Sequence, residues 1–407
     1  IHTGFERYSF RNSINARLND RFNIGQSLKA FYTNRHGDLT DNYDEAPISR
    51  AFQSQAIIPV YDIMGNFAGS RGLGMGGSQN PVAMLTRAKN NYSKNFRLLG
   101  TLFGEANIIE GLTFKSFLGY DFRQVNTKNM RLANPEAAMA ETIDRLTQGT
   151  NYSFQWNWAN TLDYNITLAD VHSLQVILGT EAIANTYNYM DAGRSQYFSN
   201  DPNYMQLSSG EINQINSGSG SEWSLFSIFG RANYDLLGKY YLEVTLRRDG
   251  SSRFGPENRY ATFPSVSFAW AISQEDFMAG TRNWIDFLKL RLGWGKSGND
   301  RIGNYNVFTT YSTHDSRAAY ALDGSNTSTS VGFQPAAMGN PDVTWETTET
   351  YNVGLDFTIL NNSLKLSADV WQRNTSDMLY RLSIPQVMGM ATAPYVNIGE
   401  MKNTGFD

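Results

Sequence analysis

The sequence predicts an all-β protein, an antiparallel transmembrane β-barrel of the outer-membrane type, and three observations support this prediction. Hydrophobic and polar residues alternate along many segments, short polar turns alternate with long loops, and the composition is unusual for a soluble protein. Charged residues make up 18% and aromatic residues 13% of the 407 residues. Soluble domains contain about 25% charged residues. A sheet with one face toward lipid accounts for these features.

The alternation is clearest between Leu288 and Gly295, where every even position is hydrophobic and every odd position is a basic residue or glycine. The segments Tyr240–Arg247, Tyr351–Ile359 and Leu364–Arg373 follow a similar pattern. Successive side chains of a strand point to opposite faces, so each segment is predicted to be a strand with one hydrophobic and one polar face.

Weaker alternation adds further strands, to a total of about 13 or 14 strands of roughly 9 to 14 residues. This length suits a tilted strand that spans a bilayer, whereas about five or six residues is usual in soluble sheets. The weaker segments are Phe10–Leu18, Phe22–Tyr32, Phe96–Asn107, Leu112–Arg123, Gln155–Tyr164, Leu174–Glu181, Phe226–Tyr234 and Val266–Ile272.

The connections alternate between two lengths. Short turns are predicted at Asn19–Asp20, Ile109–Gly111, Thr167–Asp170, Leu236–Lys239 and Leu360–Ser363. Long loops rich in Gly, Ser, Asn and Asp are predicted at 36–90, 124–150, 188–220, 298–345 and 374–395. Outer-membrane barrels place short turns in the periplasm and long loops outside the cell. Aromatic residues near strand ends fit the interfacial girdles of such barrels: Tyr164, Tyr234, Tyr240 and Trp284.

Other architectures fit the sequence less well. A soluble propeller would repeat about every 40 to 50 residues, and the sequence shows no fixed period. A membrane-spanning helix needs about 18 consecutive apolar residues, and no such run occurs. The net charge of −4 gives no reason to expect a nucleic-acid partner.

The sequence predicts no cofactor and no metal site. There is no cysteine, which excludes disulfides, thiolate metal sites and cysteine nucleophiles. The four histidines are widely separated and form no zinc-binding pair: His2, His36, His172 and His314.

Two strings resemble nucleotide-binding motifs but lack the context these motifs need. Gly72–Gly77 fits G-x-G-x-x-G, yet no apolar strand precedes it and Pro81 is expected to interrupt a following helix. The string Gly295-Lys296-Ser297 lies at a strand end, and Leu290 stands where a phosphate-binding loop has glycine. No G-x-S-x-G string is present. The protein is therefore not expected to be an enzyme.

Charged residues concentrate on the non-lipid face of the predicted strands. A hydrated lumen needs polar side chains in any case, and the same residues are also candidates for contacts with a plug domain or a solute. They are Arg97, Glu105, Lys115, Asp121, Arg123, Glu181, Arg231, Glu243, Arg247, Lys289, Arg291, Asp356 and Asp369.

Several longer strings resemble the SusC/RagA-type receptors, which are TonB-dependent transporters of the Bacteroidota outer membrane. The three longest are Asn233–Gly255, Tyr260–Trp270 and Phe287–Asn299. Shorter ones are Pro59–Asn66, Asn340–Glu346 and Asn397–Gly405. Their order and spacing match the family along nearly the whole chain.

This resemblance implies a barrel of about 22 strands with an N-terminal plug. Residues 1–407 are then expected to form a partial barrel of about 13 or 14 strands, without the plug and the C-terminal strands. We expect these strands to form an open trough, paired in chain order. One edge is expected near Phe5–Leu18 and the other near Leu364–Tyr380 or the tail after Tyr395.

The resemblance also implies the function and the partners. Such receptors import glycans or oligopeptides with a SusD-like surface lipoprotein, and TonB supplies energy through the plug. The expected partners are therefore this lipoprotein, TonB, outer-membrane lipid and the solute. The alternatives are a TonB-dependent receptor for a siderophore or another small nutrient, and a passive porin.

Overall fold

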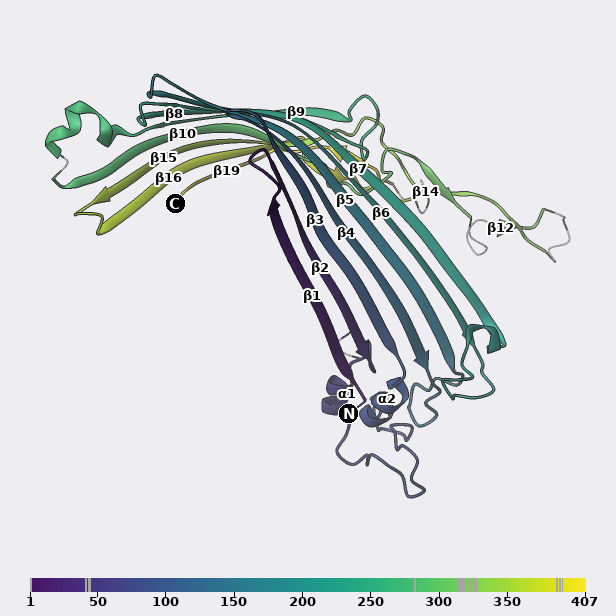
Figure 1. Cartoon of the computed structure of the whole chain (residues 1–407). Helices are drawn as coiled ribbons and strands as arrows, with labels where there is room; N and C mark the ends of the chain where they lie inside the picture. Colours follow the sequence, from purple (N-terminus) through teal and green to yellow (C-terminus); the bar gives the residue numbers. More distant parts are fainter. Residues whose placement is uncertain are drawn as a thin grey trace.

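The computed structural model describes residues 2–40, 42, 45–281, 283–313, 319–322, 324, 328–385, 387, 389 and 391–407. It is dominated by one strongly curved antiparallel sheet of 13 strands (Figure 1). These strands are β1 (Gly4–Arg17), β2 (Phe22–His36), β3 (Tyr92–Ile109), β4 (Leu112–Arg131), β5 (Arg145–Leu168), β6 (His172–Ser195), β7 (Ile212–Leu236), β8 (Tyr240–Ser251), β9 (Tyr260–Trp270), β10 (Ile285–Asn299), β15 (Glu346–Ile359), β16 (Leu364–Ser376) and β19 (Met401–Phe406).

The strands pair with their neighbours in chain order, from β1 at one edge to β19 at the other. This confirms the predicted all-β class, the strand number, the chain-order pairing and the positions of the two edges. In the described part of the chain β1 and β19 are not paired with each other, so the sheet is open rather than closed. All five predicted short turns fall between consecutive strands of the sheet.

Three small two-stranded sheets lie in the long loops. β11 (Thr310–Ser312) pairs with β14 (Gln334–Ala337), β12 (Ala319–Tyr320) with β13 (Ser330–Val331), and β17 (Leu379–Arg381) with β18 (Tyr395–Asn397). β12 and β14 project away from the main sheet in Figure 1. His314 and parts of the predicted loops 298–345 and 374–395 lie outside the described residues.

The predicted strand length is wrong for the middle of the sheet, where β5, β6 and β7 have 24, 24 and 25 residues. The predicted loops 124–150 and 188–220 shrink accordingly to 132–144 and 196–211. Alternation marks only the part of a strand that faces lipid. Beyond it the strict alternation is lost, and the strands continue mainly through Thr, Tyr, Asn and Ser.

The loop 36–90 contains two helices that the sequence analysis missed, α1 (Pro47–Gln53) and α2 (Pro81–Ala88). Pro81 begins α2 instead of interrupting a helix. The Asn80 side chain accepts the N–H groups of Val82 and Ala83, and a proline in the first helical turn loses no hydrogen bond. The residues directly before Gly72 still form no strand, so the nucleotide-binding interpretation gains no support.

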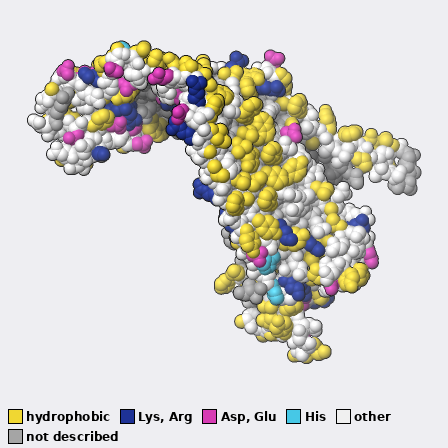
Figure 2. Space-filling view, viewed as in Figure 1, with side chains coloured by type: hydrophobic (Ala, Val, Ile, Leu, Met, Phe, Trp, Pro, Cys, Tyr) yellow, Lys and Arg dark blue, Asp and Glu magenta, His cyan; other side chains and the backbone are white. Residues whose placement is uncertain are grey.

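The two faces of the sheet differ as the alternation predicts. One row of opposing residues runs through Phe22, Ala106, Phe114, Leu162 and Leu178 on β2 to β6. We call the face that carries this row the apolar face, and the opposite one the polar face. Hydrophobic side chains cover the middle of the long strands in Figure 2, and many are half exposed, such as Leu246 at 55% and Val353 at 51%.

The fully buried hydrophobic side chains lie mainly at the long-loop end. Trp345 packs against Phe254 and Phe263, with ring centroids 5.2 and 5.4 Å apart. In loop 196–211, Met205 is completely buried against Met130 and Leu146 of the sheet. These small cores hold the loops against the strand ends, while the sheet itself keeps its hydrophobic side chains on the outside.

Aromatic residues mark the short-turn end. Tyr164, Tyr234 and Tyr240 lie at strand ends as predicted, and Trp284 lies in the β9–β10 connection, 53% exposed. Within the described residues, the helices are too short or too polar to cross a membrane.

Leu292, on the apolar face and 41% exposed, tests which face meets lipid. Arginine on the lipid face near the midplane costs roughly 2–4 kcal/mol. In the complete barrel, of which we expect this sheet to be a part, Leu292→Arg should lower the folded fraction and Leu292→Ala should leave it nearly unchanged, measured by heat-modifiable gel mobility after refolding into lipid vesicles. Equal folding of the two variants would contradict the assignment of the lipid face.

Candidate functional site: the polar face of the sheet

The strand register places all the predicted lumen-facing charges on the polar face. In β3 and β4, for example, Arg97 lies opposite Arg123, and Glu105 lies opposite Lys115. The same register carries the polar face through β5 and β6 to the later strands, where Arg291 lies opposite Gly354. The polar face is therefore a charged wall that extends from β3 to β16.

The charges on β3 and β4 form a first group of contacts. Arg97 donates two hydrogen bonds to Asp121, at 2.9 and 2.6 Å. Lys115 and Glu105 lie 4.0 Å apart. Arg123 donates only a long bond of 3.4 Å to Asn95 and forms no ion pair within the described residues. The structure thus pairs four of these predicted charges and leaves Arg123 without a carboxylate.

A second group lies on β6, β7 and β8. Arg231 bonds to Glu243, and Arg247 bonds to Glu181 at 2.9 Å. Arg247 also bonds to Asp249 at 2.6 Å. Asp249 was missed by the sequence analysis, although it has the same strand parity as Arg247.

The third group centres on Arg291 and connects β10, β15 and β16. Its guanidinium donates to Asp356 at 2.9 and 3.0 Å and to Asp369 at 3.0 and 2.9 Å. Gly354 lies between Arg291 and Asp369 in the register. A Cβ atom at Gly354 would lie 2.7 Å from Arg291 Cζ, so glycine gives the guanidinium room to reach the third strand.

Lys289 lies beside this third group, with its ammonium 4.8 Å from the centre of the Tyr241 ring. Both residues line a hollow of about 560 Å³ in the short-turn half of the polar face. The hollow is floored by small residues, including Ser267, Ala269 and Gly293. This wall has room for another polar surface or a solute.

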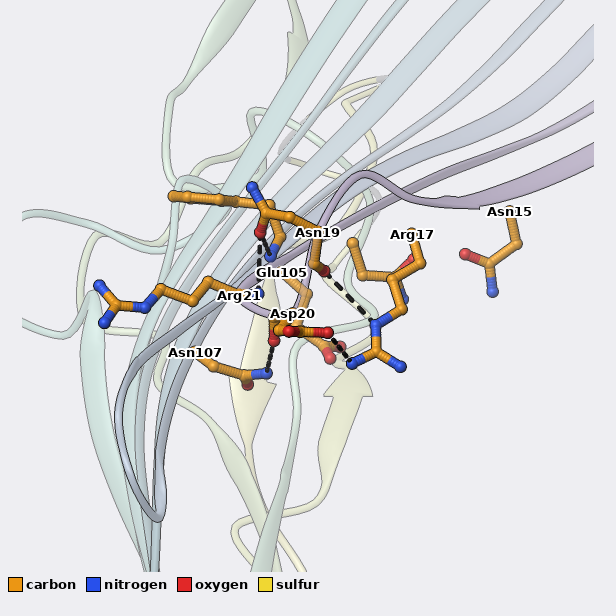
Figure 3. A pocket seen from close by; sticks show the side chains of 9 residues that line it. Asn15, Arg17, Asn19, Asp20, Arg21, Glu105 and Asn107 are labelled. Atoms are coloured by element: carbon orange, nitrogen blue, oxygen red, sulfur yellow. Dashed lines mark hydrogen bonds and ion pairs between the residues drawn. The ribbon is translucent and has the colours of Figure 1, made fainter.

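A second hollow, of about 400 Å³, lies at the β1–β2 turn (Figure 3). Arg17 bonds to Asp20 at 2.8 Å, and the Asn19 side chain accepts the backbone N–H groups of Arg21 and Phe22. Asn107 on β3 donates to the Asp20 carbonyl at 3.3 Å. These bonds stay within the turn and its neighbour, so they fix the edge of the sheet.

Glu275 is a further structural residue that the sequence analysis missed. It lies between two short 3-10 helices, Ile272–Gln274 and Asp276–Thr281, at the short-turn end. It accepts hydrogen bonds from Tyr240 at 2.6 Å, Trp270 at 3.0 Å and Lys239 at 3.1 Å. These donors lower the pKa of Glu275 to about 2. Glu275 ties the ends of β8 and β9 together outside the membrane-spanning segments.

The arrangement favours a hydrated wall over a catalytic centre. The predicted polar-face charges are spread over several strands, and most of them are paired between strands. Within the described residues, no group of three or more His, Asp or Glu side chains could hold a metal ion.

The chain is similar in sequence to known receptors. A family profile described as "TonB dependent receptor-like, beta-barrel" matches residues 2–407. TonB-dependent receptor P39 of Formosa agariphila is 29% identical over 415 residues, which cover 100% of this chain and 37% of the relative. TonB-dependent receptor SusC of Bacteroides thetaiotaomicron is 32% identical over 286 residues, which cover 67% of this chain and 27% of the relative. The chain therefore spans less than half the length of these relatives.

The chain is also similar in fold to solved structures of receptors. The RagAB peptide importer in its "closed-closed" state matches with a TM-score of 0.83 at 26% identity, over 100% of this chain and 44% of its own. The siderophore receptor PirA from Acinetobacter baumannii matches with a TM-score of 0.55 at 13% identity, over 99% of this chain and 50% of its own. The second likeness concerns the fold alone. These relatives are named as receptors and importers rather than enzymes.

Replacing Arg291 should destabilise the wall, because it leaves Asp356 and Asp369 adjacent and unneutralised. Breaking a fully buried pair costs about 3–5 kcal/mol. These side chains are 21–32% exposed, so we expect Arg291→Ala in the complete barrel to cost about 1–2 kcal/mol in urea unfolding from lipid vesicles. Arg123→Ala, the matched control, should cost less than about 0.5 kcal/mol.

A double-mutant cycle tests whether Arg291 and Asp369 interact. Adding Asp369→Asn to Arg291→Ala should recover part of the loss, since one of the two neighbouring negative charges disappears. Strictly additive costs would show that Arg291 and Asp369 do not interact.

Glu275 should make stability depend on pH in a defined window. Its pKa is lowered from 4.5 to about 2 in the folded protein, so its contribution is fully present above 4.5 and is lost as the pH falls through about 2. The difference in urea midpoint between wild type and Glu275→Gln should be constant from pH 7 to pH 5 and shrink below pH 4.5. A difference that grows on acidification would contradict the hydrogen-bond assignment.

Proposed function

Because the chain belongs to the TonB dependent receptor-like β-barrel family, we propose that it is part of an active importer for glycans or oligopeptides. It is a SusC/RagA-type receptor of the outer membrane. The observation that supports import best is the contrast between the two faces. One is hydrophobic and half exposed, as lipid contact requires, and the other is a charged wall, as an aqueous path requires.

We infer that residues 1–407 are one part of a larger barrel with a plug inside it. The sheet has two edges in the described part of the chain, and lipid leaves no water to satisfy an unpaired edge. Further strands would pair with β1 and β19. The polar-face residues would then contact the plug or the solute, with Lys289 and Arg291 beside the hollow of the β8–β10 wall.

The proposed partners are a SusD-like surface lipoprotein at the long loops and TonB, which would act through the plug. Likeness to SusC and to the RagAB peptide importer supports this choice over a siderophore receptor, to which the chain is only 10–13% identical. A passive porin would share the two-faced wall, so energy dependence separates it from an active importer.

Uptake in whole cells tests the proposed function. Cells that produce the receptor should accumulate labelled oligosaccharides or oligopeptides too large for porins, and a protonophore or loss of TonB should abolish the accumulation. A receptor-dependent uptake that survives both treatments would indicate a passive pore. Uptake of ferric siderophores alone would favour the small-nutrient alternative.

The orientation of the sheet in the membrane can be tested separately by cysteine labelling, because residues 1–407 contain no cysteine that would react in the background. An impermeant maleimide should label Met64→Cys, in the loop between β2 and β3, on intact cells. Asn361→Cys, in the β15–β16 turn, should react only after the outer membrane is permeabilised. The reverse labelling would place the short turns outside the cell.

A further inference from the structure

Toward the long loops, the apolar face passes through a row of aromatic side chains. Tyr8, Tyr32 and Phe96 lie opposite one another on β1, β2 and β3, and after Gln124 on β4 the row continues with Tyr152 on β5. The rings of Tyr8 and Tyr32 stack at 6.4 Å. Aromatic rows of this kind mark the membrane–water interface of barrels. The outward-facing residues just beyond it therefore lie at the depth of the lipid headgroups.

Two lysines occupy this position on adjacent strands. Lys128 on β4 lies opposite Tyr92 on β3, and Lys94 is two residues along β3 on the same face. The Lys94 ammonium lies 4.4 Å from the centre of the Tyr92 ring. Lys128 Nζ donates to the Met205 carbonyl at 3.3 Å. One ammonium group thus lies over the Tyr92 ring, and the other, from the residue opposite Tyr92, bonds to the loop that Met205 anchors.

In the part of the chain that the structure describes, no carboxylate pairs with these lysines. Neither forms an ion pair within the described residues, and their register neighbours on this face, Asn34, Asn126 and Gln148, are uncharged. The nearest carboxylate by register is Glu6 on β1, two strands from Lys94. On the polar face several cations do pair with carboxylates, among them Arg97, Arg231 and Arg291, although Arg123 and Lys289 form no ion pair within the described residues.

A similar arrangement recurs on the apolar face at β8 and β9. Arg248 lies opposite Ile228, and its guanidinium carbon lies 5.3 Å from the centre of the Tyr260 ring. It too forms no ion pair within the described residues. At the loop end of this face Lys94 and Arg248 therefore each lie over an aromatic ring, and neither has a carboxylate partner among the residues that the structure describes.

We propose that Lys94, Tyr92 and Lys128 form a binding site for the phosphate groups of outer-leaflet lipid headgroups. Lysine binds phosphate as a compact charge, and a basic residue near an anionic membrane surface is attracted by about 1 kcal/mol. The tyrosine ring positions one ammonium, and the loop carbonyl positions the other. This site rests on the proposed orientation, in which the long loops lie outside the cell.

The test uses the intact receptor, purified and delipidated, with three probes: diphosphoryl lipid A, the same lipid without phosphates, and inorganic phosphate. Native mass spectrometry measures the bound lipid. We expect each lysine removed to weaken binding of diphosphoryl lipid A about fivefold, and Lys94→Ala/Lys128→Ala more than either single variant. Lys365→Ala, a lysine on the polar face near the short turns, is the matched control and should bind as wild type does.

The remaining variants and probes test whether the site recognises the phosphate groups of the lipid. Lys94→Arg/Lys128→Arg should retain binding, which separates charge from folding defects. Equal binding of the dephosphorylated lipid, or unchanged binding in the double alanine variant, would overturn the proposal. Competition by inorganic phosphate at equal concentration would show an anion site without headgroup selectivity and would also overturn it. Cysteine labelling tests the orientation separately. If the labelling is as expected but lipid binding depends neither on the two lysines nor on the phosphates, only the lipid site is contradicted, and the proposed function is not.

Discussion

The constraint on which the structure depends is backbone hydrogen bonding in a medium without water. In hydrocarbon each unpaired N–H or C=O costs several kcal/mol, so a spanning sheet must continue its ladder without gaps through the apolar band. The register meets this demand: β3 to β7 pair almost residue by residue, and the irregularities fall at strand ends, at Asn107 beside the β3–β4 turn and at Gly193 in the long-loop end. The period of two then follows, since every strand shows one face to lipid and one to water.

The same constraint explains what could be predicted from the sequence. Alternation located the strands and the face of the thirteen charged residues predicted to line the lumen, because these depend on local parity alone. The ion-pair partners of Arg97 and Arg291 depend on how neighbouring strands are aligned, and that of Arg291 also depends on the space beside Gly354. The sequence of a single strand does not contain this information. Strand ends beyond the lipid and the helix at Pro81 were mispredicted, because burial no longer dictates a pattern there.

Glu275 shows a different limit. It lies in a connection with no periodic signal, and its three donors come from Lys239, Tyr240 and Trp270 at the ends of two strands. Only the folded arrangement brings them to one carboxylate. The small cores around Trp345 and Met205 have the same origin, as they form between loops and strand ends that are distant in sequence.

The surroundings of several basic side chains differ between the two faces, although Lys289 on the polar face also lies over an aromatic ring, that of Tyr241. On the polar face water partly screens charges, and carboxylates on neighbouring strands neutralise arginine at modest cost. On the apolar face, near lipid, a carboxylate is costly to desolvate, and basic side chains instead extend toward the interface along aromatic rings. Lys94 on Tyr92 and Arg248 on Tyr260 follow this rule. Their charge is left for a counterion from the membrane, while the charge of Arg291 is already neutralised by Asp356 and Asp369 within the wall.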